Sequence, residues 1–326
     1  MLNLKRSAVL LLCLLAALSS TACRIPPTLL EEQPTPFPAA SALPSAPLPN
    51  ETGGAEPTPE ASAPQDSRTV SATLYYITDE GYLLPVAERI PSVDGIARAC
   101  LMRLVDSPEN AAALKKQGLI APIPAGTELS LSIAGGEAVV DLRGMSALPD
   151  AARERALYAC VVNTLLGFPT VERVSLLIDG SPNETPNGST PPSGAGRIAL
   201  NAENGSVAAR GSAKPLTLYV PTESAAHYIP VTRYVEGSDG LSAAVGALVA
   251  GTELPGLRSC FPRNTLLLGA TIENGILTVN LSKDFEHVAE QSGLYSLAMH
   301  AVLLTAMRYG SVDEVQFAVN GMPYEP

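Results

Sequence analysis

Apolar residues recur along this chain with two different periods, and the change between the periods predicts the secondary structure. Two short apolar runs, Leu74–Ile77 and Leu83–Ile90, flank the turn-forming residues Asp79-Glu80-Gly81 and predict a β-hairpin. A helical spacing then begins after Asp94, which is a suitable N-cap. The residues that share one helical face are Ile96, Cys100, Leu101, Leu104 and Val105.

The next stretch repeats the change from strand to helix. Two β runs, Glu128–Ile133 and Glu137–Leu142, are separated by Gly135-Gly136, and a second helix is predicted from about Asp150 to Gly167. Its apolar stripe consists of Leu157, Cys160, Val161, Thr164 and Leu165. A last apolar strand, Arg173–Ile178, completes the order β-α-β-β-α-β with an extra hairpin at the start. This pattern predicts an α/β (α+β) domain of one sheet with two helices on one face, and leaves strand order open.

The whole pattern occurs twice. The matching segments, in the same order along the chain, are Leu74-Tyr75-Tyr76 with Leu218-Tyr219-Val220, Leu84-Pro85-Val86 with Ile229-Pro230-Val231, Asp94-Gly95-Ile96 with Asp239-Gly240-Leu241, Val140-Asp141-Leu142 with Val279-Asn280-Leu281, and Val174–Gly180 with Val315–Gly321. The chain therefore carries a tandem duplication, with a first domain at 71–181 and a second at 215–326. Residues 182–214, rich in Pro, Gly, Ser and Asn, are predicted to be a flexible linker.

The N-terminus has the organisation of an export signal. Lys5 and Arg6 precede an apolar run from Ala8 to Leu18, and small residues lead to Cys23. This resembles a bacterial lipoprotein signal, with a signal peptide at 1–22 and Cys23 as the acylated residue; Ser20 stands where Leu or Val is usual. The alternative is an ordinary secretory signal in which Cys23 is incidental.

Composition then limits the classes of partner. Residues 23–70 are rich in Pro, Ala, Ser and Glu, and predict a disordered stalk between the lipid and the first domain. The formal net charge of −11 argues against binding to nucleic acid or anionic lipid headgroups. The absence of Trp weakens a carbohydrate-binding interpretation.

Three cysteines remain after Cys13 leaves with the signal peptide and Cys23 takes the lipid. Cys100, Cys160 and Cys260 are an odd number, which favours free thiols over a disulfide framework. The repeat aligns the first two of them with Val245 and Ala301, so we expect both to be small core residues. The role of Cys260 stays open.

No residue pattern predicts catalysis, a metal or a cofactor. The histidines, which are His227, His287 and His300, have no second ligand at metal-binding spacing. Asp141 and Asp179 could form a carboxylate pair for acid–base work, but the second copy has Asn280 and Asn320 at these places. Because Asn cannot ionise yet supports the same turns, we expect a structural role for both aspartates and a protein that is not an enzyme.

The first copy resembles the GerMN domain of sporulation and spore germination proteins. The segments that carry the resemblance are Leu74-Tyr75-Tyr76, Pro124–Leu129, Ala138–Leu142, Val162–Leu165 with Phe168-Pro169, and Val174–Gly180. The second copy keeps Leu277–Phe285 but replaces the Asn-Thr-Leu motif with Leu304-Thr305-Ala306. A lipoprotein signal followed by two such domains resembles the germination lipoproteins of this family.

The resemblance implies a setting and a role. Such proteins lie on the mother-cell membrane, facing the forespore, and help to assemble or localise an envelope complex through protein partners. They bring no known catalytic residues, cofactor or metal. We therefore expect a lipid-anchored, extracytoplasmic assembly protein; the alternatives are an accessory lipoprotein of a sensor kinase and a protein that binds peptidoglycan or the spore cortex.

Overall fold

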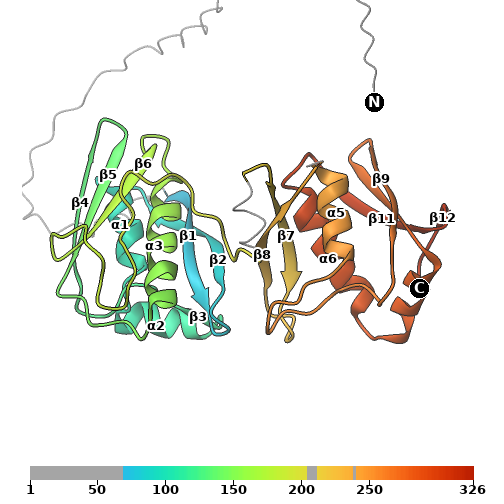
Figure 1. Cartoon of the computed structure of the whole chain (residues 1–326), viewed down its shortest axis with the longest axis horizontal. Helices are drawn as coiled ribbons and strands as arrows, with labels where there is room; N and C mark the ends of the chain where they lie inside the picture. Colours follow the sequence, from blue (N-terminus) through green and yellow to red (C-terminus); the bar gives the residue numbers. More distant parts are fainter. Residues whose placement is uncertain (1–68, 204–210, 238–239) are drawn as a thin grey trace, which may run out of the picture. The chain divides into compact units, whose positions relative to one another are not determined.

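The computed structural model describes residues 69–203, 211–237 and 240–326, which form two domains of similar organisation (Figure 1). In the first domain the elements are β1 (Thr69–Thr78), β2 (Leu83–Pro91), α1 (Ile96–Arg103), α2 (Pro108–Lys115), β3 (Leu119–Ile120), β4 (Glu128–Ala134), β5 (Glu137–Arg143), α3 (Ala151–Leu165) and β6 (Arg173–Ile178). In the second they are β7 (Lys214–Pro221), β8 (Tyr228–Val235), α5 (Leu241–Val249), β9 (Leu267–Glu273), β10 (Ile276–Leu281), the 3₁₀ helix η1 (Lys283–Glu290), α6 (Leu294–Ala306), β11 (Glu314–Val319) and β12 (Met322–Pro323).

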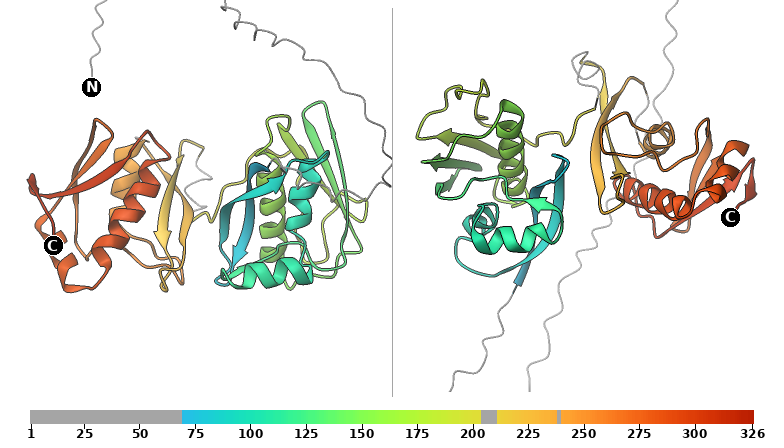
Figure 2. Two further views of the ribbon diagram at one scale, coloured as in Figure 1. Left: turned by 180° about the vertical axis from the view of Figure 1, so that it is seen from behind. Right: turned by 90° about the horizontal axis from the view of Figure 1, so that it is seen from below.

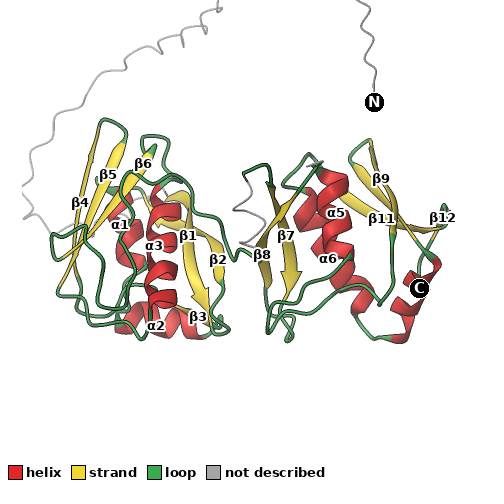
Figure 3. Ribbon diagram, viewed as in Figure 1, coloured by secondary structure: helices red, strands yellow, loops and turns green. Residues whose placement is uncertain are grey.

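The predicted α/β class and the duplicated order of elements are confirmed, but the strands of each domain do not form one sheet. The first domain has sheets β2-β1-β3 and β4-β5-β6, and the second has β7-β8 and β12-β11-β10-β9 (Figure 3). In each domain the longest helix packs against the first strand of the hairpin, α3 against β1 and α6 against β7. The Thr164 hydroxyl on α3 accepts a hydrogen bond from the Tyr75 backbone N–H of β1, so a helix side chain takes the place of a neighbouring strand.

Helix ends follow local capping chemistry, with one correction to the sequence-based expectation. Helix α3 starts at the predicted Asp150, whose Oδ1 accepts a hydrogen bond from the Arg153 N–H at 2.8 Å. Asp94, in contrast, does not cap α1, because Gly95 is the N-cap with φ 76° and no side chain bonds to the first turn. Helix α2 was not predicted, although Ser107 caps it and Pro108 occupies its first turn.

Each domain buries its own core between the helices and the strands. The predicted face of α1 is buried, with Cys100, Leu101 and Leu104 fully enclosed in the core of the first domain. The corresponding face of α5 packs in the second core through Val245 and Leu248. Apolar stripes predicted from the sequence therefore form the cores of both domains.

The segment between the domains, predicted as a flexible linker, forms hydrogen bonds to the first domain within its described residues 182–203. Val174 of β6 and Ala195 exchange backbone hydrogen bonds of 2.9 and 2.8 Å, and the Leu176 N–H donates to the Pro192 carbonyl at 2.8 Å. The Asn163 amide on α3 bonds to both backbone groups of Ile198, at 2.9 and 3.0 Å. Backbone pairing, which the Pro and Gly content of the segment concealed, thus fixes it to the first domain.

The same segment also reaches the hairpin of the second domain (Figure 2). The Asn201 side chain accepts from the Leu83 N–H and donates to the carbonyls of Leu83 and Pro230, with distances of 2.8 to 2.9 Å. Thr232 of β8 donates its backbone N–H to the Leu200 carbonyl and accepts from the Glu203 N–H. Residues 198–203 therefore bond to strands of both domains.

Candidate functional site

The predicted lipid-anchor residue, Cys23, lies outside the described residues, as do the signal peptide and most of the stalk. Among the residues that the structure describes, there is no helix of the length and apolar character needed to cross a membrane. The anchor therefore remains a prediction of the sequence.

The two candidate carboxylates hold backbone turns. Asp141 Oδ1 accepts a hydrogen bond from the Gly180 N–H at 2.8 Å, and Asp179 Oδ1 accepts from the Gly144 N–H at 2.8 Å. Asp179 is in the left-handed backbone region with φ 52°. In the second domain Asn280 Oδ1 accepts from the Gly321 N–H at 2.8 Å.

The second-domain pair thus repeats two features of this geometry without a charge, the hydrogen bond at Asn280 and the left-handed backbone at Asn320. Asn320 has φ 48°, as Asp179 has φ 52°. The structural role expected for Asp141 and Asp179 matches these contacts, because an amide oxygen serves at Asn280 as a carboxylate oxygen does at Asp141.

Each histidine bonds to another group of the chain, and for His227 that group lies in the first domain. His227 Nε2 lies 2.7 Å from the Gln117 carbonyl, and His300 Nδ1 lies 2.8 Å from the Ser296 carbonyl. His287 Nδ1 lies 2.9 Å from Glu290 Oε1, an exposed pair that raises the pKa of His287 by hydrogen bonding and charge. Over 69–203, 211–237 and 240–326, His, Cys, Asp and Glu side chains form no group of three or more that could hold a metal ion.

The three cysteines of the folded domains are free and buried. Burial raises the pKa of Cys100 to about 11 and that of Cys260 to about 12, and it raises the pKa of Cys160 as well. Cys260, whose role the sequence left open, packs in the core of the second domain. All three behave as small apolar residues, as predicted for Cys100 and Cys160.

A buried carboxylate that the sequence did not single out lies at the start of α3. Glu154 is 3% exposed and accepts hydrogen bonds from the hydroxyls of Thr185 and Ser189 and from the Asn187 amide. Burial alone would raise its pKa, but these hydrogen bonds outweigh burial and hold the pKa below its usual value. The charge of Glu154 fastens the segment that follows the first domain.

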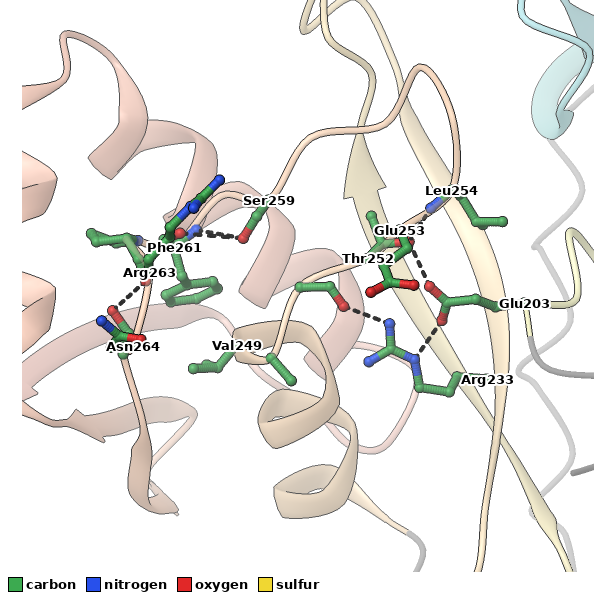
Figure 4. Close-up of a pocket in the computed structure, with 14 residues that line it drawn as sticks. Glu203, Arg233, Val249, Thr252, Glu253, Leu254, Ser259, Phe261, Arg263 and Asn264 are labelled. Carbon is green, nitrogen blue, oxygen red and sulfur yellow. Dashed lines mark hydrogen bonds and ion pairs between the residues drawn. The ribbon is translucent and has the colours of Figure 1, made fainter.

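A half-buried ion pair lies beside a groove of ≈ 940 Å³ in the second domain, where Figure 4 shows Glu203 and Arg233 facing each other. Arg233 Nε donates to Glu203, and its two terminal nitrogens donate to the Ala247 and Gly251 carbonyls at the end of α5, at 2.6 and 2.5 Å. The Thr252 hydroxyl donates to the other Glu203 oxygen at 2.6 Å.

Both members of this ion pair are thus engaged within the chain. Burial would raise the pKa of Glu203, but hydrogen bonds from Arg233 and Thr252 lower it. Arg233 also stabilises the carboxyl end of α5, where carbonyls lack helical partners. The pair therefore fixes residue 203 to the second domain, and the polar atoms of Glu203 and Arg233 are themselves largely occupied.

Comparisons with known proteins agree with the tandem organisation. The model of the family described as "Sporulation and spore germination" (Germane) matches residues 73–184 and 217–325. The solved structure of the tandem GerMN domains of the sporulation protein GerM from Bacillus subtilis is similar, at 25% identity and a TM-score of 0.57. That match covers 78% of this chain and 92% of that one.

A structure of the first GerMN domain of the same protein matches at 28% identity with a TM-score of 0.36, over 40% of this chain and 98% of that one. Among curated proteins, none matches the chain.

Proposed function

This chain belongs to the family of sporulation and spore germination proteins, and from that premise we propose that it is a membrane-anchored, non-enzymatic lipoprotein that helps to assemble an envelope complex between mother cell and forespore. The observation that carries the proposal is the family match, which includes both domains and therefore nearly all of the folded mass. The similar tandem structure is that of a sporulation protein, which supports the same setting.

The N-terminal organisation supports an anchored position. Acylation at Cys23 and cleavage after residue 22 would leave a Pro-rich stalk between the membrane and the first domain. Two acyl chains give stable membrane attachment where one chain is marginal. A domain pair held in this way is suited to contact other proteins in the space between two membranes.

The contacts of the acidic residues support a binding role over catalysis. The carboxylates of Asp141, Glu154 and Glu203 accept hydrogen bonds from within the chain. The donors are the Gly180 N–H, the Thr185 hydroxyl and the Arg233 side chain, respectively. General acid–base catalysis needs a carboxyl group that can reach a substrate proton. These carboxylates are occupied in holding the fold, which leaves the exposed surfaces of the domains for function.

The duplication supports engagement of partners at more than one point. When two linked domains bind the same assembly, the second contact forms at a high effective concentration, and the combined affinity exceeds that of either domain. Bonding of residues 198–203 to both domains lowers the entropy cost of presenting the two together.

The test is complementation of a gene deletion in the native host during sporulation. We expect the deletion to block or delay spore formation, and the parent gene to restore it. A Cys23→Ala variant should restore it poorly and should leave the membrane fraction, whereas the matched Cys13→Ala variant should behave as the parent does. A deletion strain that forms and germinates spores normally would contradict the proposed role, and a membrane-bound Cys23→Ala protein would contradict the anchor.

A further inference from the structure

A cleft of ≈ 730 Å³ lies where the β1–β2 hairpin faces the β7–β8 hairpin. Repeat-equivalent residues line it from the two domains, in the pairs Thr73 with Thr217, Tyr75 with Tyr219, and Pro85 with Pro230. The two copies thus contribute the same hydroxyls, aromatic rings and proline rings to one space. The cleft exists only because the domain is duplicated, since a single hairpin supplies one half of it.

Two arginines give this cleft a positive character. Arg197 and Arg308 line it, whereas no Asp or Glu does. Arg197 donates a hydrogen bond to the Tyr75 hydroxyl at 3.0 Å. Arg308 is close enough to Tyr219 that its charge partly offsets the burial that raises the pKa of that tyrosine.

Neither guanidinium forms an ion pair with a carboxylate in the described part of the chain. The cleft therefore carries two positive charges and no lining carboxylate, in a chain whose formal net charge is −11. An acidic ligand would be repelled by most of this protein and attracted at this cleft.

Part of the cleft lining is held in place by hydrogen bonds within the chain. Residues 198–200 line the cleft, and they are bonded to Asn163 through Ile198 and to Thr232 through Leu200. Arg197 directly precedes this anchored stretch, so its backbone is positioned as well. Pre-organised groups lose less entropy on binding, which favours affinity.

We propose that this cleft binds an extended, carboxylate-bearing segment of a partner protein, an inference that rests on the proposed function and deepens it. Arginine is suited to carboxylates because its planar fork of N–H donors matches the two carboxylate oxygens. Tyrosine and proline rings offer flat apolar walls to an extended chain, and tyrosine hydroxyls can bond to its backbone. The volume is within the range of pockets that enclose small ligands.

The test measures binding of a defined probe to the full chain purified in detergent. The probe is a fluorescein-labelled synthetic peptide of alternating Glu and Pro, and the matched peptide has Gln in place of each Glu. Fluorescence anisotropy gives both dissociation constants. Purified peptidoglycan sacculi are offered separately in a co-sedimentation assay.

The decisive variant is Arg197→Gln with Arg308→Gln, and the matched control is Arg89→Gln with Arg263→Gln. The control removes the same charge from exposed arginines that do not line the cleft. We expect the parent and the control to bind the Glu peptide, and the cleft variant to bind it at least about tenfold more weakly. The Gln peptide should be weaker for the parent by a similar factor.

Three outcomes would overturn the proposal: no binding of the Glu peptide by the parent, equal binding by the cleft variant, or sacculus binding that needs the arginines while the peptide is ignored. The last would assign the cleft to the cell wall. Each of these outcomes can occur while gene deletion still impairs sporulation. A wrong assignment of the cleft can therefore be distinguished from a wrong proposed function.

Discussion

The two domains secure the segment that follows their last strand by different chemistry at the same place. In the first, Glu154 at the start of α3 binds the segment from Thr185 to Ser189 through hydrogen bonds. In the second, the equivalent position on α6 is Tyr295, whose hydroxyl donates to the Tyr324 carbonyl at 3.4 Å. A cluster of aromatic rings surrounds this contact, formed by Phe261, Phe285, Tyr295, Phe317 and Tyr324.

The contacts that hold the backbone frame, in contrast, are repeated. Thr164 accepts a hydrogen bond from the Tyr75 N–H at 3.2 Å, and Thr305 accepts from the Tyr219 N–H at 2.9 Å. The turn after the last strand is likewise held by an oxygen at residue 141 or 280. The two domains therefore share the side chains that bond to the backbone of their strands. The segment after the last strand, in contrast, is held by a carboxylate in the first domain and by aromatic rings in the second.

The largest expected effect is that of Phe285→Ala, which removes the centre of the aromatic cluster. Phe285 is fully buried, and its ring centroid lies 4.8 Å from that of Phe317 and 5.7 Å from that of Tyr324. Truncation of a buried Phe costs about 3–5 kcal/mol. Hydrogen exchange resolved by domain should show reduced protection in the second domain and unchanged protection in the first. An equal loss in both would mean that the two domains do not fold independently.

A smaller effect is expected from Glu154→Leu, which leaves three donors without their acceptor. Hydrogen bonds to a charged group are worth about 1.5–3 kcal/mol, so the first domain should lose stability in this range. The free energy of unfolding, measured in urea, reports the loss. The matched control is Glu109→Gln, an exposed carboxylate of the same domain, which should change stability by less than about 0.5 kcal/mol.

Acid should act on the same contact. Because the pKa of Glu154 is lower in the folded domain than in the unfolded chain, its contribution is present above the unfolded pKa of about 4.3 and is lost as pH falls through the folded value. The Glu154→Leu variant should therefore show a weaker dependence of first-domain stability on pH below about 5. An unchanged acid profile would contradict an ionised, hydrogen-bonded Glu154.

Asn163→Leu should have a more local effect, because the second domain already has Leu304 at this place. Asn163 is 1% exposed and bonds to both backbone groups of Ile198. Its loss should cost about 2 kcal/mol and should raise hydrogen exchange at residues 196–200 while the core of α3 stays protected. Unchanged exchange there would show that the segment between the domains does not depend on this anchor.

The sequence was sufficient for the features that depend on periodicity and repetition. The apolar faces of α1 and α3, the hairpins and the equivalence of Cys100 with Val245 all appear in the structure as expected. Apolar side chains at helical or alternating spacing must be buried together, so their pattern specifies the elements. A structural role of Asp141 and Asp179 could also be predicted, because the second copy has Asn280 and Asn320 at the equivalent positions.

Features that depend on contacts distant in the sequence could not be predicted. The linker composition indicated flexibility, yet Asn163 of α3 bonds to Ile198 in the linker, and Asn201 of the linker bonds to Pro230 of the second domain. No periodicity marks either asparagine. One signal was present: Glu154 falls on the apolar stripe of α3, three residues before Leu157, where a carboxylate needs buried partners. The split into two sheets and the Thr164 contact with β1 join residues far apart in the sequence, so only the folded arrangement reveals them.

The central claim is that the protein acts through its surfaces and that its carboxylates serve the fold, and the most direct test is the spore yield of an Asp141→Asn, Asp179→Asn double variant. Asn280 and Asn320 already occupy the equivalent positions, and the Oδ1 atoms that accept from Gly180 and Gly144 are retained. We predict a folded protein, by circular dichroism, that restores sporulation of the deletion strain as the parent gene does. Loss of spores by a variant that remains folded would contradict the account and indicate a carboxylate-dependent activity.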